Sequence, residues 1–376
     1  MFSIAPGRRR APVRLMLLFS VAGCGHAAAP ATPAEYVLGP PEVVVSEQSG
    51  VLASPTDLTL DSGGSLYVLD RMDKRIVRLS PDGRVAGTIG GSGQGPGELT
   101  DPLAFGVDAG DSVRVFDFGT GAIEVFSATG TYVRQYRPDI PGIPSRIEFG
   151  PDGRVAYGGT HPTSQGALVA ELDQSGVQTG LLDSLVSAET TIPTDLLEQV
   201  HQRRLPGFMR NSALPVLTRD GGAWLFLQTE GVLEHFKADR TRDVRQKVDV
   251  PEMTGIAEAF FNWYAHVQAR DMLRYFAYVA DAAATSGSVW LLWQTSADQP
   301  ALITLHDSKG HLCARLLLHG VGEDAQQPDG EMSPPRRRLA VDARRSRIYV
   351  LDQNTTQVWA FAVPVTSADT SACSTG

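Results

Sequence analysis

Short strands of apolar residues recur along the chain, and each ends at an aspartate that precedes a turn. The clearest copies lie at 66–70, 113–117 and 348–352. An alternating strand precedes each copy, and a further apolar strand follows it. In the first two copies a polar turn and a fourth strand come next. The pattern predicts a repeated unit of up to four antiparallel strands joined by tight turns.

Three weaker copies fill the middle of the chain. Their central strands lie at 155–157, 223–227 and 289–293, each behind a glycine-containing turn. The six central strands start 47, 42, 68, 66 and 59 residues apart. The first two spacings match the ~40–50 residues of one propeller blade. The three longer spacings predict extra segments inserted between blades.

Six repeats predict an all-β fold, a six-bladed β-propeller over residues 36–365, because each small sheet can bury its faces only against its neighbours. The last repeat, 339–363, contains three strands. Residues 42–45 have the composition of the missing outer strand, and their addition would close the ring and remove an open sheet edge. A two-domain β-sandwich is the alternative, but repeats at both ends of the chain favour ring closure.

Two insertions, about 184–212 and 252–283, have helical character. Apolar residues from Phe260 to Val279 roughly follow helical spacing. The second insertion combines aromatic and cationic side chains, which are enriched in binding surfaces. The predicted ligand or partner surface consists of Trp263, Tyr264, Arg270, Arg274 and Tyr275. Either the helix only covers the propeller, or it forms a lid over the central funnel.

The first residues have the pattern of an export signal. Arginines precede an apolar run at 15–23, which is far shorter than the ~20 residues that span a bilayer. The run ends Val21-Ala22-Gly23-Cys24, which resembles the bacterial lipobox. The resemblance implies a signal peptide at 1–23, acyl chains on Cys24 that bind the lipid bilayer, and sorting to the outer membrane because Gly25 is not an aspartate. An ordinary signal peptide is the alternative.

Composition sets further limits. Hydrophobic residues make up 42% of the 376 residues and the formal net charge is -9. Without a basic stretch beyond the N-terminus, nucleic acid is excluded as an expected partner. We expect a monomer with a tether at 24–35 and a C-terminal tail at 366–376. Cys313 and Cys373 form either a disulfide, which export permits, or two free thiols.

The pattern of residues 55–70, with its spaced aspartates and the ending Tyr-Val-Leu-Asp, resembles the NHL repeat. The string 91–99, followed by Pro102, is similar to the glycine-rich hallmark of bacterial six-bladed β-propeller lipoproteins. The resemblance implies a six-bladed propeller and no particular activity. Because no Gly-Lys-Ser/Thr follows, we interpret the glycines as a structural loop and not as a phosphate site.

No catalytic constellation stands out. Asp70, Asp117 and Asp352 could converge on Ca²⁺, but their recurrence favours turn capping. The histidines lack zinc spacing, and the predicted inner strands are mainly apolar except for Arg146 and Glu148. We therefore expect no cofactor, metal or catalytic residue, and a module that binds a protein, small molecule or glycan. The alternative is a metal-dependent hydrolase or lyase of the lactonase-like propeller type.

Overall fold

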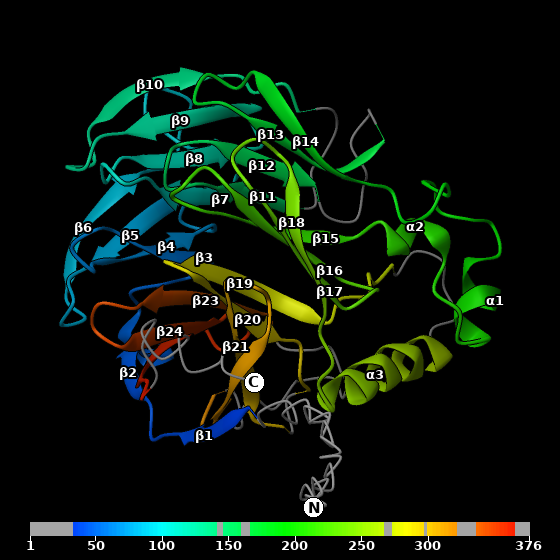
Figure 1. The fold of residues 1–376 in the computed structure, drawn as a ribbon. Coiled ribbons are helices and arrows are strands. Elements are labelled where there is room, and N and C mark those ends of the chain that lie inside the picture. Colours follow the sequence, from blue (N-terminus) through cyan, green and yellow to red (C-terminus); the bar gives the residue numbers. More distant parts are fainter. Residues whose placement is uncertain are drawn as a thin grey trace, which may run out of the picture.

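Six small antiparallel sheets surround a common axis (Figure 1). The computed structural model describes residues 33–140, 146–158, 166–266, 273–296, 299–321 and 336–364. The innermost strand of each sheet contacts the innermost strands of the next and the previous sheet, and the last sheet contacts the first. The predicted six-bladed β-propeller is confirmed.

Each of the first three blades has four strands, which follow one another along the chain and pair in that order from the axis outward. Blade one contains β3 (Pro55–Leu60), β4 (Leu66–Asp70), β5 (Arg75–Leu79) and β6 (Val85–Gly90). Blade two contains β7 (Pro102–Val107), β8 (Val113–Asp117), β9 (Ala122–Phe126) and β10 (Tyr132–Tyr136). Blade three contains β11 (Arg146–Phe149), β12 (Val155–Gly158), β13 (Ala167–Leu172) and β14 (Gln178–Ser184).

The last three blades repeat this order, and the final one has three strands of its own. Blade four contains β15 (Ala213–Leu217), β16 (Ala223–Leu227), β17 (Val232–Phe236) and β18 (Arg242–Lys247). Blade five contains β19 (Val279–Thr285), β20 (Ser288–Trp293), β21 (Ala301–Asp307) and β22 (Leu312–Leu318). Blade six contains β23 (Arg337–Asp342), β24 (Arg347–Asp352) and β25 (Gln357–Ala362).

Strand β2 (Glu42–Val45) completes blade six. It pairs antiparallel with β25, with Val43 opposite Trp359. The predicted ring closure by residues 42–45 is therefore confirmed. Pairing of the two ends of the propeller joins the first and last blades through backbone hydrogen bonds and covers an edge that would otherwise be open.

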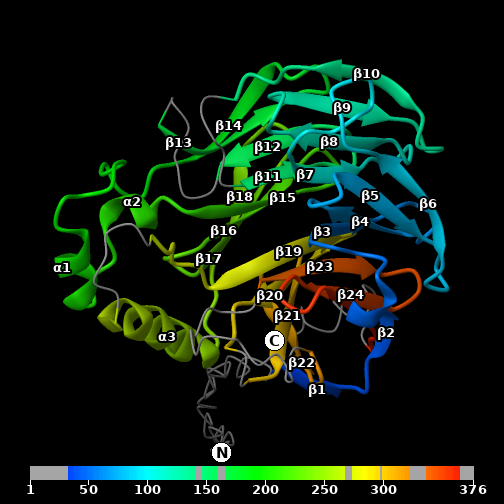
Figure 2. The ribbon, with the colours of Figure 1, turned by 180° about the vertical axis from the view of Figure 1, so that it is seen from behind.

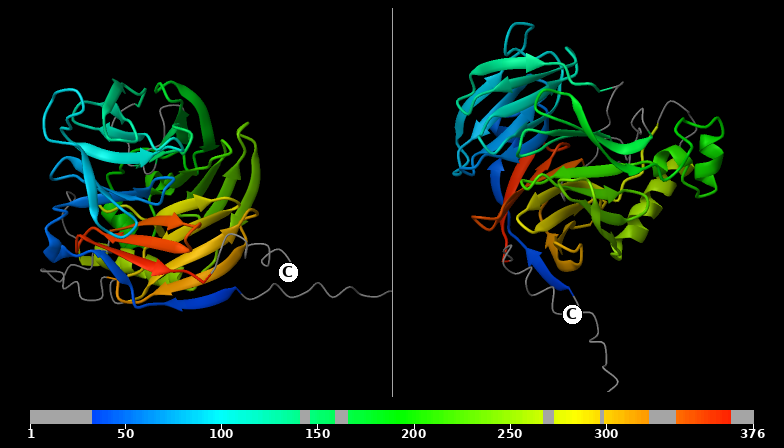
Figure 3. Two further views of the ribbon diagram at one scale, coloured as in Figure 1. Left: turned by 90° about the vertical axis from the view of Figure 1, so that its left-hand side faces the viewer. Right: turned by 45° about the horizontal axis from the view of Figure 1, so that its top comes forward.

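A second N-terminal strand, β1 (Ala34–Leu38), adds to blade five. It pairs in parallel with β22, so that this blade has five strands, and Figure 3 shows it in dark blue beside the orange strands. The predicted boundary of the tether at residue 35 is wrong, because Ala34 and Glu35 already belong to β1. The strand is held by Leu38, which packs into the apolar cluster between blades five and six.

The core is divided among the blades. Each pair of neighbouring blades encloses its own apolar cluster, for example Val68 and Leu351 between blades one and six. The second strand of a blade lies between two such clusters, so that every residue of β4, β8 and β16 is buried. Burial on both faces explains why these strands are continuous apolar runs instead of alternating ones.

The helices form a lobe beside the propeller (Figure 2). They are α1 (Leu196–His201), α2 (Gly207–Arg210) and α3 (Glu252–His266). Their apolar side chains form a cluster of their own, with Phe260, Tyr264 and Phe276 at its centre. The second predicted insertion is too long, because residues 279–283 belong to β19, and Leu273 and Phe276 follow the helix in non-helical backbone.

The recurring aspartates at the ends of the second strands are structural. The carboxylate of Asp70 accepts hydrogen bonds from the amides of Ala53 (2.8 Å) and Ser54 (2.9 Å), and Asp117 does the same for Thr100 and Asp101. Each fixes the loop that enters its own blade. The predicted capping of the following turn is confirmed for Asp117, which also accepts from the amide of Gly119, and for Asp352, which accepts from the amide of Asn354. Asp70 instead fixes only the loop before its blade.

The glycine-rich segment before β7 is a compact loop. The amide of Leu99 donates to Gly91 O at 2.7 Å, and that of Gly95 donates to the carboxylate of Glu98 at 2.8 Å. Gly97 has a φ of +79°, and a Cβ there would lie 2.9 Å from the Cβ of Tyr132. Only glycine combines this conformation with this close approach, so the structural interpretation of the loop is supported.

Candidate functional site: the axial channel

A cavity of about 690 Å³ runs along the propeller axis. Its walls are the inner strands of the blades, and it extends to the turns that join each inner strand to the second strand. Arg219 and Arg344 lie in two of these turns and are exposed, which makes this face the mouth of the channel. We call these turns the mouth turns; they span 61–65, 108–112, 150–154, 218–222, 285–288 and 342–346.

Four charged residues of the inner strands occupy one equivalent position in their blades. Asp57 pairs with Leu69, the residue before the recurring aspartate of blade one. Arg146, Asp281 and Arg338 pair with the corresponding residues of blades three, five and six. Blades two and four have Ala104 and Leu214 there. The repeat symmetry therefore brings these four side chains to the same level around the axis.

Ion pairs connect this ring of charges. Arg146 donates to Asp281 at 2.6 Å, although the two residues lie in blades three and five, and also to Glu148 at 3.3 Å. Asp281 accepts a second hydrogen bond from the amide of Leu339 at 2.8 Å. Arg338 lies 3.6 Å from Asp57. Three carboxylates and two guanidinium groups thus lie close together and partly buried at the end of the channel away from the mouth turns, which we call the deep end.

Burial changes the protonation of this cluster. Desolvation raises the pKa of Glu148 to about 8, against a lowering by Arg146 and a further raising by Asp281 and Asp57. Desolvation also raises the pKa of Asp57, while Arg338 and Arg146 oppose that shift. For Arg146, the neighbouring carboxylates raise the pKa although burial lowers it. At neutral pH Glu148 is therefore mostly a neutral acid beside the guanidinium group of Arg146.

Hydrogen bonds join the mouth turns of neighbouring blades into a belt. Arg345 donates to Gly63 O at 2.5 Å, which links blade six to blade one. The amide of Ser62 donates to the Asp111 carboxylate at 2.7 Å, which links blade one to blade two. The amide of Ala109 donates to Pro151 O at 2.6 Å, which links blade two to blade three. The mouth is consequently held in place before any ligand arrives.

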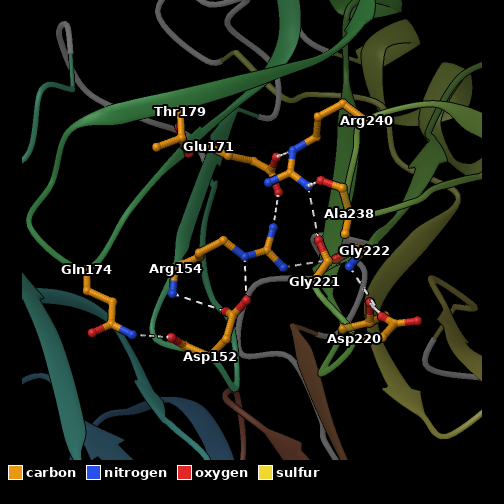
Figure 4. A network of polar contacts seen from close by, with 11 residues as sticks. Asp152, Arg154, Glu171, Gln174, Thr179, Asp220, Gly221, Gly222, Ala238 and Arg240 are labelled. Atoms are coloured by element: carbon orange, nitrogen blue, oxygen red, sulfur yellow. Dashed lines mark hydrogen bonds and ion pairs between the residues drawn. The ribbon is translucent and has the colours of Figure 1, made fainter.

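A buried ion network continues the belt from blade three to blade four (Figure 4). Glu171, which is fully buried, accepts from Arg154 at 2.6 Å and also pairs with Arg240. The other ends of these guanidinium groups hold the mouth turn of blade four. Arg154 donates to Gly222 O at 3.2 Å, and Arg240 donates to Gly221 O at 3.0 Å.

The five residues predicted as a ligand or partner surface in the second insertion do not form one exposed surface. Tyr264 is fully buried, and its hydroxyl donates to Arg274 O at 2.8 Å. Its place on a ligand surface is therefore a wrong prediction, because the helical lobe needs it as core. Trp263, Arg274 and Tyr275 are half-buried around it, and Arg270 lies outside the described residues. Apart from residues 281–283, which belong to strand β19, no described residue of the two insertions lines the channel, so the lid alternative has no support there.

The remaining candidate residues are the recurring aspartates and the cysteines. Asp70, Asp117 and Asp352 do not line the channel, and over the described ranges no three His, Cys, Asp or Glu side chains group as a metal site requires. Cys313 is disulfide-bonded. Cys373 and Cys24 lie outside the described residues, so the predicted pairing and the predicted lipidation stay predictions.

Sequence reasoning missed most of the channel cluster. It singled out Arg146 and Glu148 as exceptions in apolar strands, but it placed Asp281 inside a helical insertion and passed over Arg338. A signal was present. Alignment of the blades on their second strands would have put Asp57, Arg146, Asp281 and Arg338 in one column.

Comparisons with known sequences agree with this architecture. A family described as 6-bladed beta-propeller matches residues 50–157. NHL repeat-containing protein 3 of mouse is 30% identical over 106 residues, which cover 27% of this chain, and the human protein is 28% identical over the same length. This chain folds as a six-bladed β-propeller, and part of it resembles NHL repeat-containing proteins. The chain spans about 30% of the length of these curated relatives.

Solved structures give the same result for the fold. A candidate exported protein of Bacteroides fragilis superposes with a TM-score of 0.51 at 11% identity, covering 88% of this chain and 99% of that chain. A gluconolactonase of Xanthomonas campestris reaches a TM-score of 0.46 at 13% identity, covering 89% of this chain and 98% of its own. The first likeness shows a shared fold; the second is too weak to bear on activity.

Proposed function

We propose that this propeller is an exported, membrane-anchored binding module that holds a small polar ligand in its axial channel. The observation that carries the proposal is the group of charged side chains, Asp57, Arg146, Glu148 and Asp281, that three blades contribute to the wall of a cavity of about 690 Å³. Small-molecule sites typically measure ~300–1,000 Å³ and combine apolar walls with a few convergent polar groups.

The walls of the channel fit this pattern. Phe105, Phe149 and Val216 supply apolar surface, and Thr59 and Thr285 add hydroxyl groups along the same passage. A ligand with both polar and apolar surface would satisfy these groups. The inter-blade belt supports the proposal further, because a site whose polar groups are fixed in advance loses little entropy on binding.

Export and anchoring are part of the proposal and depend on the N-terminal sequence. The arginines, the short apolar run and Cys24 match an export signal with a lipid-accepting cysteine. Over the described residues no helix is long and apolar enough to span a bilayer. Acyl chains on Cys24 would thus supply the attachment.

A hydrolase or lyase of the propeller type is the second candidate. One observation favours it: burial raises the pKa of Glu148 to about 8, and a carboxylic acid that keeps its proton near neutral pH can serve as a general acid. The metal-dependent version has less support, since the carboxylates of the channel pair with arginines instead of grouping with one another as ligands.

The binding proposal is tested by closing the channel. Thr59 lines the channel on β3, and Thr88 lies exposed on β6, the outer strand of the same blade. We expect polar sugar-sized probes to bind the wild type and the Thr88→Trp variant but not Thr59→Trp, as measured by saturation-transfer NMR. Equal binding by both variants, or no binding by the wild type, would overturn the channel as the site.

A further inference from the structure

Two cations at the channel mouth have unused hydrogen-bonding capacity. The Arg219 guanidinium makes no hydrogen bond or ion pair with the described residues, and Arg344 makes one, donating to Ser62 O at 3.2 Å. Each guanidinium carries five N–H donors. Both side chains line the same cavity, Arg219 from blade four and Arg344 from blade six.

The carboxylates at the mouth are, in contrast, already occupied. Asp61 accepts from the amide of Ser65 at 2.8 Å and lies 3.4 Å from Arg78. Asp342 pairs with Arg345 at 2.7 Å. Asp220 accepts from the hydroxyl of Thr218 at 2.5 Å, and this hydrogen bond lowers the pKa of Asp220. The mouth therefore presents free cationic donors beside carboxylates that already accept hydrogen bonds within the protein.

At the deep end of the channel the guanidinium groups are paired instead of free. Arg146 pairs with Asp281, and Arg338 lies beside Asp57. Glu148 adds little negative charge near neutral pH, because burial raises its pKa to about 8. This end can donate and accept hydrogen bonds without attracting a net charge, which suits an uncharged polar group.

We propose that Arg219 and Arg344 form an anion-binding entrance, and that the ligand is an organic anion with one carboxylate or phosphate group held at the mouth. Its uncharged polar part extends toward Arg146 and Glu148. The proposal rests on the channel being the binding site. Arginine suits this role because its planar fork matches the geometry of carboxylate and phosphate groups.

The entrance is positioned by the buried network of blades three and four. Arg154 and Arg240 donate hydrogen bonds to the carbonyls of Gly222 and Gly221, and these bonds fix the turn that carries Arg219. Arg344 lies beside Arg345, whose hydrogen bond to Gly63 O ties its turn to blade one. Both arginines therefore project from turns that are fixed, although their own guanidinium groups stay available.

The test compares probes that share one sugar ring and differ in charge. We expect D-glucuronate and glucose 6-phosphate to bind the wild type at least tenfold more tightly than methyl glucoside, as measured by calorimetry at low salt. The double variant R219A/R344A should lose this preference. Arg84→Ala is the matched control, because Arg84 is exposed on the turn before β6, with 86% of its side chain accessible. It should bind as the wild type does.

The outcomes separate this inference from the proposed function. Preference for glucuronate over glucose 6-phosphate, or the reverse, identifies the anionic group while supporting the entrance. If all three probes bind the wild type equally and Thr59→Trp abolishes this binding, the anion-binding entrance is overturned and the channel remains the site. Charged probes that bind R219A/R344A as tightly as the wild type would also overturn the entrance. Failure of all three to bind the wild type would overturn both proposals.

Discussion

At the scale of single residues, Glu148 controls the charge balance of the channel. It lies two residues beyond Arg146 on β11, and its neighbours include the ion pair of Arg146 with Asp281. When Glu148 ionises, its negative charge adds to that of the neighbouring Asp281 carboxylate, which is already paired with Arg146. The protein therefore carries an acid whose proton is held by the folded structure.

Replacement of Glu148 by glutamine should change the pH dependence of stability. The pKa is about 8 in the folded protein and near 4.5 without the fold. Between these values the folded state keeps a proton that the unfolded state has lost. Wild-type stability should therefore fall as pH rises from about 4.5 to about 8, by at most ~1.4 kcal/mol per pH unit for one proton.

The Glu148→Gln variant should show a shallower fall in the free energy of unfolding over that range, measured by urea denaturation from pH 5 to pH 8. Glu258→Gln is the matched control, because Glu258 pairs with Arg203 on the surface and 51% of its side chain is exposed. Parallel curves for Glu148→Gln and the wild type would contradict the assignment of a raised pKa.

A second residue-scale prediction concerns Glu171. Its removal would leave Arg154 and Arg240 without their buried anion. We expect Glu171→Ala to lower the free energy of unfolding by about 3–5 kcal/mol, the range for breaking a buried ion pair. Glu258→Ala, which breaks an exposed pair, should cost less than about 1 kcal/mol. Chemical denaturation of both variants measures these losses. Similar losses in the free energy of unfolding for the two variants would contradict a tightly coupled network around Glu171.

At the scale of elements, the N-terminal strands serve two blades at once. Strand β2 completes blade six, and β1 extends blade five. One short segment therefore ties together the neighbouring blades at the point where the ring closes. Because a ring without this closure has an unpaired outer edge, the two strands should contribute strongly to the stability of the whole propeller.

Two neighbouring positions on β1 test this contribution. Leu38 is buried between blades five and six, whereas Val37 is 67% exposed. Leu38→Ala should cost about 2–5 kcal/mol in the free energy of unfolding, the range for large-to-small changes in a core. Val37→Ala should cost less than about 0.5 kcal/mol. If the two variants unfold at the same denaturant concentration, β1 does not pack on blade five in solution.

At the scale of the whole molecule, six apolar clusters between blades replace a single core. Because each blade packs against its two neighbours, the described residues of the propeller form one continuous ring. The same radial symmetry leaves an axial passage where the inner strands meet. Charged side chains there can accumulate without disturbing the clusters, because the inner strands alternate between channel and core.

Attachment to a membrane is a prediction about the whole molecule. We expect the wild type to fractionate with membranes and Cys24→Ser to be released into the soluble fraction, because a serine cannot accept the thioether-linked lipid. Cys373→Ser should remain with the membranes as the wild type does. Fractionation of cells followed by immunoblotting gives the result. Membrane association of Cys24→Ser would remove the lipid anchor from the proposed function.

The local sequence pattern was sufficient to predict the strands of the strongest blades. The runs at 66–70 and 113–117 are apolar because both faces of these strands are buried, and their aspartates recur because each caps its own loop. The missing strand of the last blade was also predictable, since an open edge requires a partner. These features depend on strand period, turn chemistry and edge pairing, which are encoded within one repeat.

Only the tertiary structure decided the functional geometry. Asp281 and Arg146 are 135 positions apart, and no local pattern indicates that they pair across the axis. Tyr264 has the composition of a binding surface but lies in a core, because its surroundings come from distant segments. The sequence thus determined which strands form and how they repeat, whereas ring closure determined which side chains meet, because contacts around an axis join residues by blade geometry and not by their order in the chain.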